Sequence, residues 1–375
     1  MTNLKTVFDT FLDDYLKMHQ PSPEQASVLT LLRICRTQKL GTHANACENC
    51  GKLSIAYNSC RNRHCPLCQS LKREMWRFDR NADLLNTHYF HIVFTVPDRL
   101  NPLFYNNQRL LYSLLMKSAA RPVLKLSASN KFLGAEVGLT GILHTWGQTL
   151  SYHPHVHFIV PGGGLSLQSG LWKATKKTFF LPIKVLSRVF RGIFLKDLKD
   201  LIHRELLYFN NHDQPLKVSN IKALLHTLYQ NDFVVFVREN FDSPTHVINY
   251  LCQYTHRVAI SNNRILKVSA DSVTFKYKDY KHAGKTKHMT LTGHEFIRRF
   301  LMHVLPTRLV KIRHYGFLAG RNRPTKLALC RKLMNILPAK TSKDFSTAEF
   351  IELVIPHNLK RCPDCDGCIR PLVPT

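Results

Sequence analysis

The sequence predicts an α+β fold in which helices pack against an antiparallel sheet. Residues 89–96 form a near-continuous apolar run that stops at Pro97, as expected of a buried strand, and a leucine-rich helical pattern follows over residues 102–120. Residues 138–144 and 152–160 have the pattern of two further strands. The order strand, helix, strand, strand matches the first half of a ferredoxin-like or RRM-like layout.

A basic insertion is expected to interrupt this sheet. Residues at about 165–230 are predicted to form a hairpin and amphipathic helices rich in Lys and Arg. The apolar run 233–237 then has the pattern of a strand that returns to the sheet. Beyond it we predict strands over residues 265–268 and 273–277 and a helix over residues 296–304.

The N-terminal residues 1–34 are predicted to form two helices. An apolar stripe at helical spacing runs from Leu4 to Met18, and Pro21 and Pro23 end it before a second helical pattern begins. Two roles stay open for this arm. It could pack on the residues that follow, or it could contact DNA.

A cysteine-rich segment follows and predicts a structural zinc site. Cys47 and Cys50 are separated by two residues, as are Cys65 and Cys68, and two such knuckles can close one tetrahedral site. Further potential ligands lie nearby, enough for a second zinc ion whose ligand set the spacing does not fix: Cys35, His43, Cys60 and His64.

The strand predicted over residues 152–160 carries a histidine pattern. Because successive side chains of a strand alternate between faces, His153, His155 and His157 lie opposite the apolar residues of this strand. His155 and His157 are therefore expected to chelate a divalent metal. The third ligand stays open among Gln148, His153 and Gln253.

The pattern of residues 243–257 predicts a helix that carries two tyrosines. The helix begins with Ser243-Pro244, and Tyr250 and Tyr254 lie four residues apart along one edge of its apolar stripe. Arg257 lies on the neighbouring polar side, one turn from Tyr254. Two phenols beside a cation suit nucleophiles that attack a phosphate.

The charge of the chain indicates a polyanionic partner. There are 53 Lys and Arg against 25 Asp and Glu, which gives a net charge of +28. Nucleic acid is the expected partner, and the candidate DNA-binding residues are Arg61, Arg63, Arg257 and Arg313. We find no apolar run long enough for a membrane span and no signal peptide, so a cytoplasmic location is expected. The clustered cysteines favour metal binding in a reducing compartment over disulfides.

The last residues carry a second cysteine cluster. Cys362, Cys365 and Cys368 provide three thiols, and the fourth ligand of a zinc site there could be His357 or Cys330.

Taken together, these motifs resemble the two-tyrosine HUH transposases of rolling-circle insertion sequences. The resemblance rests on the HxH and YxxxY patterns, on residues 59–69 (SCRNRHCPLCQ) and on residues 313–318 (RHYGFL), and it extends from about residue 35 to about residue 323. It implies that His155 and His157 hold Mg²⁺ or Mn²⁺ and that Tyr250 and Tyr254 attack DNA. It also implies zinc on the N-terminal cysteines Cys47, Cys50, Cys60, Cys65 and Cys68 and on His64.

The resemblance also implies a domain order and a reaction. The chain would comprise a helical arm (1–34), a zinc-binding domain (35–86), an HUH catalytic domain (87–300) and a C-terminal basic region (301–375). It would nick and rejoin single-stranded DNA at element ends and target through a 5′-phosphotyrosine intermediate, in association with the nucleoid.

Three other functions are alternatives for this sequence. A rolling-circle replication initiator would use the same chemistry on a replication origin. A zinc-finger DNA-binding regulator would make the HxH and YxxxY patterns coincidental. A metal-dependent hydrolase would need a carboxylate soon after the second histidine, and Phe158, Ile159 and Val160 follow it instead.

Overall fold

The chain folds into two compact units, each built from separate stretches of sequence. The computed structural model describes residues 3–166, 168–176, 180–208, 210–211, 214–215, 218–238, 246, 248, 252, 259–354 and 361–372. One unit comprises Met1–Ala82, Cys252–Val304 and Ala339–Thr375, and the other comprises Asp83–Leu251 and Leu305–Pro338. These units differ from the four consecutive domains that the sequence predicts, because the chain returns to each unit after leaving it.

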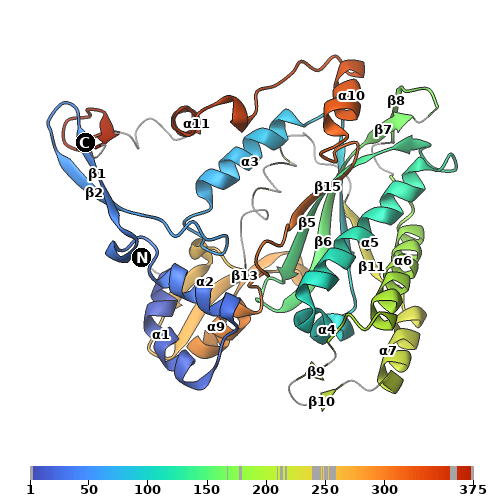
Figure 1. The fold of residues 1–375 in the computed structure, drawn as a ribbon, viewed down its shortest axis with the longest axis horizontal. Helices are drawn as coiled ribbons and strands as arrows, with labels where there is room; N and C mark the ends of the chain where they lie inside the picture. The colour runs from blue at the N-terminus through green and yellow to red at the C-terminus, as the bar shows by residue number, and fades with distance from the viewer. Residues whose placement is uncertain are drawn as a thin grey trace. The chain divides into compact units, whose positions relative to one another are not determined.

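The second unit contains a five-stranded antiparallel sheet (Figure 1). Its strand order is β11-β3-β6-β5-β15, so the histidine strand β6 is central. The predicted α+β fold with an antiparallel sheet is confirmed. The edge strand β15 was not predicted as a strand. The strands are β3 (Tyr89–Thr95), β5 (Gly138–Trp146), β6 (Tyr152–Pro161), β11 (Val234–Arg238) and β15 (Ile312–Gly316).

Helices cover one face of this sheet and enclose the main core. Alternation along β3 and β6 directs Phe94, Val156 and Phe158 into that core, where all three are fully buried. Each fully buried aromatic or branched side chain contributes about 1.5–3 kcal/mol relative to exposure. The helices are α4 (Asn101–Asn106), α5 (Gln108–Ala128), α6 (Ile183–His203) and, packed on α6, α7 (Val218–Gln230).

Shorter elements complete the second unit. A three-stranded sheet lies next to a π-helical turn and a short helix, and Lys326 of that turn pairs with Glu136 of the sheet. The elements are η2 (Asp98–Leu100), β4 (Ala135–Glu136), β7 (Gly163–Ser166), β8 (Trp172–Ala174), β9 (Asn210–Asn211), β10 (Gln214–Pro215), η5 (Arg323–Leu327) and α10 (Ala328–Leu333).

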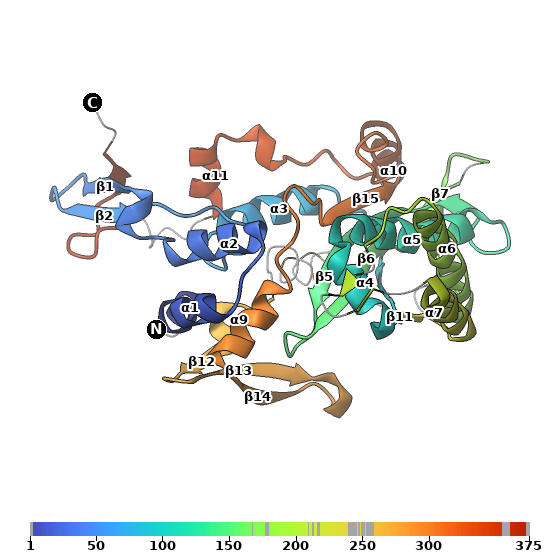
Figure 2. The ribbon, with the colours of Figure 1, turned by 60° about the horizontal axis from the view of Figure 1, so that its bottom comes forward.

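In the first unit, helix α1 packs against α2, against α9 and against strand β12 of a second antiparallel sheet (Figure 2). Phe8 of α1 meets Phe300 of α9 edge to face, with ring centroids 5.5 Å apart. Ser22 and Gln25 form a capping box at the start of α2. The elements are α1 (Leu4–Met18), α2 (Pro23–Arg33), α3 (Ser70–Ala82), η3 (Asn262–Arg264), β12 (Ile265–Val268), β13 (Ser272–Asp279), η4 (Tyr280–His282), β14 (Lys285–Thr292), α9 (Gly293–Leu301), η6 (Ser342–Asp344) and α11 (Thr347–Val354).

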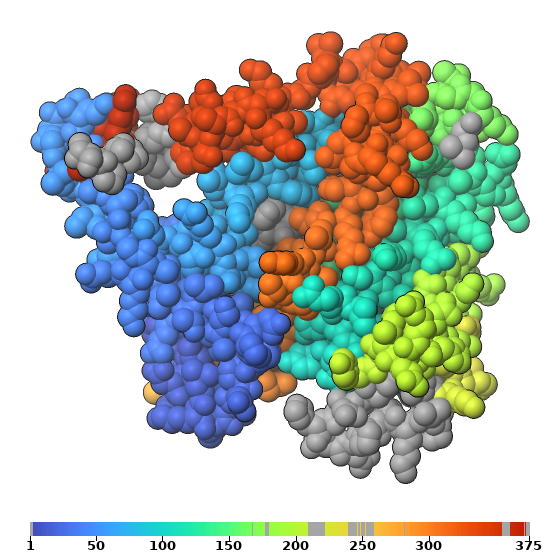
Figure 3. All heavy atoms as spheres, in the orientation of Figure 1, coloured from blue at the N-terminus to red at the C-terminus, as the bar shows by residue number. Residues whose placement is uncertain are grey.

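A small three-stranded sheet in the same unit contains segments from both ends of the chain. After η1 (Gln38–Leu40), the hairpin strands β1 (Thr42–Cys47) and β2 (Leu53–Tyr57) pair with each other. The tail strand β16 (Ile369–Pro371) pairs with the other edge of β1. The tail therefore lies beside the N-terminal hairpin (Figure 3).

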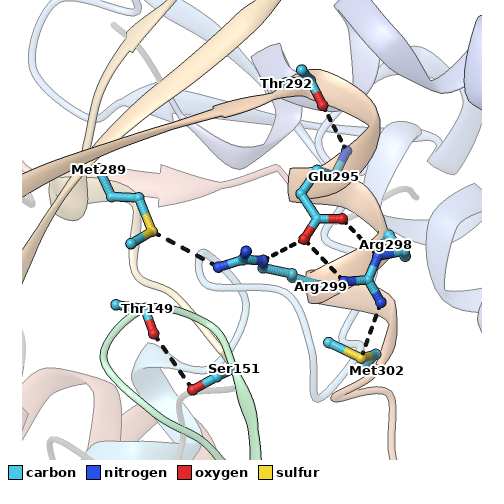
Figure 4. Close-up of polar contacts among 8 residues, drawn as sticks. All are labelled: Thr149, Ser151, Met289, Thr292, Glu295, Arg298, Arg299 and Met302. Carbon is cyan, nitrogen blue, oxygen red and sulfur yellow. Dashed lines mark hydrogen bonds and ion pairs between the residues drawn. The ribbon is translucent and has the colours of Figure 1, made fainter.

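Helix α9 is fixed by its first turn (Figure 4). The Thr292 hydroxyl accepts a hydrogen bond from the Glu295 backbone N–H, and the Glu295 carboxylate accepts bonds from Arg298 and Arg299. These guanidinium groups, Arg298 first, lower the pKa of Glu295 to about 2. Glu295 is therefore ionised at neutral pH and lies at the helix end where the macrodipole favours an anion.

Replacing Gly141 on β5 should destabilise the sheet that carries the histidines. A Cβ at Gly141 would lie 2.5 Å from Cε1 of Phe158, so either the ring or the strand must shift. We expect Gly141→Ala to lower stability by about 1–3 kcal/mol.

Gly192 of α6 is the matched control, because a Cβ there meets nothing within 4 Å. Gly192→Ala should leave stability unchanged or raise it by up to about 1 kcal/mol. Scanning calorimetry of the full-length variants gives the comparison. Equal melting of the two variants would show that β5 and β6 do not pack as described.

Candidate metal centre and cysteine clusters

Three histidines meet on the face of the sheet opposite the helices. His155 and His157 alternate with the core residues of β6, and the register of the β5–β6 hairpin pairs His144 with His155. One ring nitrogen from each of His144, His155 and His157 lies within 4.8 Å of the others. The predicted two-histidine pair therefore belongs to a group of three, which could hold a metal ion.

His144 was not predicted as a ligand, because alternation assigns side chains to faces within a strand but does not give the pairing between strands. The spacing of the hairpin could have identified His144. If residues 147–151 form the turn, His144 of one strand lies opposite His155 of the next. His153 is not in the group, and its Nδ1 lies 3.3 Å from the Asp98 carboxylate. Gln148 lies in the turn, Gln253 lies outside the described residues, and both stay open as further ligands.

Hydrogen bonds orient two of the imidazoles. His155 Nδ1 lies 2.6 Å from the carbonyl oxygen of His153, which can only accept, so Nδ1–H donates and Nε2 keeps a lone pair. His157 Nδ1 lies 2.7 Å from Nε2 of buried His91, which leaves His157 Nε2 for a metal. His91 is thus a second residue that sequence reasoning missed. Only its place on β3, next to β6, could have pointed to it.

Burial keeps these histidines neutral at physiological pH. It lowers the pKa of His155 and of His91 to about 4, and it lowers the pKa of His157 well below its usual range. A metal ligand must be an unprotonated imidazole, so no proton has to be displaced before binding.

The donor set fits a divalent transition metal. Imidazole nitrogen suits cations of the first transition row, whereas Mg²⁺ prefers oxygen ligands, so Mn²⁺ fits better than Mg²⁺. Within the part of the chain that the structure describes, no carboxylate joins the three histidines. Three protein ligands also leave coordination positions open for a substrate.

A four-cysteine cluster in the first unit has the composition of a structural zinc site. Cys35 follows α2, and Cys60, Cys65 and Cys68 precede α3. The sulfur of Cys68 lies 3.3 Å from that of Cys35 and 3.6 Å from that of Cys60. Contact with the Cys60 thiol and burial raise the pKa of Cys65, and burial raises that of Cys35 to about 11. Despite burial, hydrogen bonds from the Cys35 and Cys65 thiols lower the pKa of Cys68 to about 7, so ionising Cys35 and Cys65 as well needs a cation such as Zn²⁺.

The predicted pairing of Cys47 and Cys50 with Cys65 and Cys68 is wrong. The hairpin β1–β2 separates the two knuckles, and Cys47 and Cys50 group with Cys362 and Cys365 instead. Spacing identifies a knuckle, but it does not say which knuckles meet. His64 is buried with its Nδ1 2.9 Å from Asn62 Oδ1, outside the group of four.

The tail cysteines also differ from their prediction. Cys368 is not in the group, and the remaining ligands come from the N-terminal hairpin. Cys330, a predicted fourth ligand, is buried in the second unit beside Phe317 and Leu327. His357, the other predicted ligand, lies outside the described residues.

The structure describes only some of the predicted nucleophiles and arginines. Tyr250, Tyr254 and Arg257 lie outside the described residues, so their roles stay predictions. Arg61 is exposed and Arg63 half-buried, in the loop that carries the first cysteine cluster. Arg313 donates a hydrogen bond of 2.9 Å to Ser113 of α5, on the helix side of the sheet and away from the histidines. DNA contact by these arginines also stays a prediction.

Fold and site define a basic α+β protein with cysteine and histidine groups that could hold metal ions. Among the described residues, no helix has the length and apolarity to cross a membrane.

Comparison with known proteins gives the family. A family model described as "Putative transposase" matches residues 138–326, and one described as "Transposase zinc-binding domain" matches residues 7–96. The "Putative transposase y4qJ" of Sinorhizobium fredii is 43% identical over 364 residues, 96% of this chain and 92% of the relative. The "Transposase for insertion sequence element IS801" of Pseudomonas savastanoi pv. phaseolicola is 28% identical over 304 residues, 79% and 71% of the two chains. No solved structure matches. The chain belongs to the transposases of the IS91/IS801 type.

Removing His144 should weaken metal binding at the histidine centre. We expect His144→Ala to lower Mn²⁺ affinity by on the order of 100-fold, because one of three nitrogen donors is lost. The control is His153→Ala, which changes a histidine of the same strand outside the group. Electron paramagnetic resonance titration with Mn²⁺ measures both. Equal affinity of His144→Ala and the wild-type chain would remove His144 from the centre.

His91 should tune the same centre without binding the metal. His91→Leu removes the acceptor of the His157 Nδ1–H, so we expect Mn²⁺ affinity to fall about 10- to 100-fold. His91→Gln retains an acceptor oxygen and should recover part of that loss. If the Leu and Gln variants bind Mn²⁺ equally, the contact between His91 and His157 has no orienting role.

Proposed function

We propose that this transposase nicks and rejoins single-stranded DNA through a 5′-phosphotyrosine intermediate during rolling-circle-type transposition. The observation that carries the proposal is the group His144, His155 and His157 at the centre of an antiparallel sheet, in a chain of a transposase family. Family membership, more than any feature of the site, favours transposon ends over a replication origin as the substrate.

The histidines would hold a divalent metal, which when bound neutralises charge on the scissile phosphate. Their own contribution is to keep that site rigid and neutral. His155 is fixed by the carbonyl of His153, and His157 is fixed by His91. A preorganised site does not have to rearrange when the phosphate arrives.

The sheet face beside the histidines suits unpaired bases. The register places Val234 and Phe236 of β11 in the same two cross-strand rows as His155 and His157, with one strand between them. Neighbouring strands are about 4.8 Å apart, so Phe236 lies roughly 10 Å from His157 across the sheet. Val234 and Phe236 are 64% and 55% exposed. An exposed phenyl ring can stack on a base whose partner strand is absent, which favours a single-stranded substrate.

Tyr250 and Tyr254 are the proposed nucleophiles. The phenolic oxygen forms a bond to phosphorus as the bond from phosphorus to the 3′ oxygen breaks, and the 3′ oxygen leaves as a hydroxyl after taking up a proton. A free 3′-hydroxyl can later attack the phosphotyrosine and restore a phosphodiester, so joining needs no ATP. Phenol has a pKa near 10, and Arg257, one helical turn from Tyr254 by sequence, is proposed to stabilise the phenolate.

The cysteine clusters and the net charge of +28 suit recognition of element ends. Arg61 and Arg63 lie between Cys60 and Cys65 of the first cluster, in a loop that zinc would make rigid. We propose that these arginines contact the phosphates of a transposon end.

Removing both phenols should abolish the covalent intermediate. The purified chain is incubated with Mn²⁺ and a 5′-labelled or 3′-labelled single-stranded oligonucleotide that spans an element end, and adducts are detected by denaturing gel. We expect an adduct on the 3′ fragment, which carries the 5′-phosphate. Tyr250→Phe/Tyr254→Phe should form none, because a phenyl ring has no nucleophilic oxygen.

Each single variant, Tyr250→Phe or Tyr254→Phe, should bind DNA normally, and at least one should still form the adduct. Tyr229→Phe, a partly exposed tyrosine of α7, is the matched control and should react as the wild-type chain does. An adduct in the double variant would place the nucleophile elsewhere. An adduct on the 5′ fragment would exclude a 5′-phosphotyrosine.

A further inference from the structure

The group formed by Cys47, Cys50, Cys362 and Cys365 lies apart from the first cysteine cluster. Its four sulfur atoms lie within 4.8 Å of one another although they come from opposite ends of the chain. The Cys47 and Cys365 sulfurs are 3.4 Å apart, and those of Cys50 and Cys362 are 3.7 Å apart. All four cysteines are free thiols.

The two halves of this group have matching backbone turns. The Gly51 N–H donates to the Cys47 carbonyl at 3.0 Å, and the Asp366 N–H donates to the Cys362 carbonyl at 2.9 Å. In both halves the donor lies four residues after the first cysteine and has a positive φ, 71° at Gly51 and 54° at Asp366. Two equivalent Cys-x2-Cys knuckles that face each other are the arrangement that closes a tetrahedral zinc site.

Among the described residues, the other contacts between the tail (residues 361–372) and the hairpin are a short strand pairing, nearby backbone hydrogen bonds and exposed ion pairs. Strand β16 is three residues long, and the ion pairs of the tail, Lys52 with Asp364 and Glu48 with Arg370, are exposed. Exposed ion pairs contribute little, and ordering a chain segment costs entropy for every residue fixed. A metal bound by all four sulfurs would supply the missing stabilisation, because ligand binding contributes directly to folding.

We propose that Cys47, Cys50, Cys362 and Cys365 bind a second structural zinc ion that joins the tail to the N-terminal hairpin. Cys362 and Cys365 lie outside residues 7–96, which the zinc-binding domain matches, so this site draws half of its ligands from beyond that domain. Zinc binding by these cysteines does not require DNA cleavage, so it can be tested separately from the proposed function.

Metal content tests the site. The full-length chain purified without added metal should contain two zinc ions, one in each cysteine cluster. Cys362→Ser/Cys365→Ser should contain one. The matched control Cys368→Ser changes a thiol of the same tail outside the group and should retain both. Two zinc ions in the double variant, or loss of one in the control, would overturn the assignment.

The reactivity of the wild-type thiols tests the site without any variant that could fail to fold. Cys50 and Cys365 are exposed and Cys368 is partly buried, so exposure alone predicts that Cys365 is alkylated before Cys368. Coordination to zinc reverses that order. Mass spectrometry after brief treatment with iodoacetamide should therefore find Cys368 modified first and Cys50 and Cys365 protected, until a chelator is added. Faster modification of Cys365 than of Cys368 in the zinc-loaded chain would overturn the proposal.

Protection of the tail thiols from alkylation should depend on the hairpin cysteines. In Cys47→Ser/Cys50→Ser, the thiols Cys362 and Cys365 should become reactive, whereas Cys35 and Cys68 should stay protected by the first cluster. If Cys362 and Cys365 stay protected in that variant, the tail binds its metal without the hairpin and the shared site is excluded.

Discussion

The register of the β5–β6 hairpin is the constraint on which the candidate site depends. It places His144 opposite His155 on one face while Val156 and Phe158 enter the core on the other. A shift of the register by one residue would exchange these faces, burying imidazoles among aromatic rings and exposing the core. The absence of a side chain at Gly141 makes room for the Phe158 ring, so the core itself selects the register. The same strand pairing thus specifies both the candidate metal centre and the hydrophobic core.

A second constraint acts between the ends of the chain. The first unit contains residues from both termini and from a middle part of the sequence. Its small sheet is complete only when β16 pairs with β1. Cys47 and Cys365 are 318 positions apart, so bringing them together closes a very long loop. Loop closure costs only about 0.6 kcal/mol more for each doubling of loop length, so a single metal can compensate for it.

Local features could be predicted from the sequence, and long-range pairings could not. Helix α1 and strand β6 follow from apolar periodicity, and alternation along β6 identifies His155 and His157 as one chelating pair. His144 needed the hairpin register, and His91 needed the position of β3 beside β6. The predicted grouping of Cys47 and Cys50 with Cys65 and Cys68 was wrong because it too depends on which distant segments pair. A Cys-x2-Cys spacing predicts a local knuckle. The partner of Cys47 is instead determined by the pairing of β1 with β16, which brings together cysteines 318 positions apart.

The two kinds of candidate metal site differ in charge, and this difference matches the roles proposed for them. Four thiolates would more than cancel the charge of Zn²⁺ and would fill its coordination sphere, so each cysteine cluster would be closed and chemically inert. Three neutral imidazoles would leave the whole charge on a bound cation and would leave coordination positions open. Burial keeps His155 and His157 unprotonated, so a cation would not compete with protons there at neutral pH. A phosphodiester brings its own negative charge, and carboxylate ligands would offset the attraction that draws it in. Histidine ligands therefore suit a centre that is proposed to bind and polarise a DNA phosphate, and cysteine ligands suit sites that only stabilise the fold.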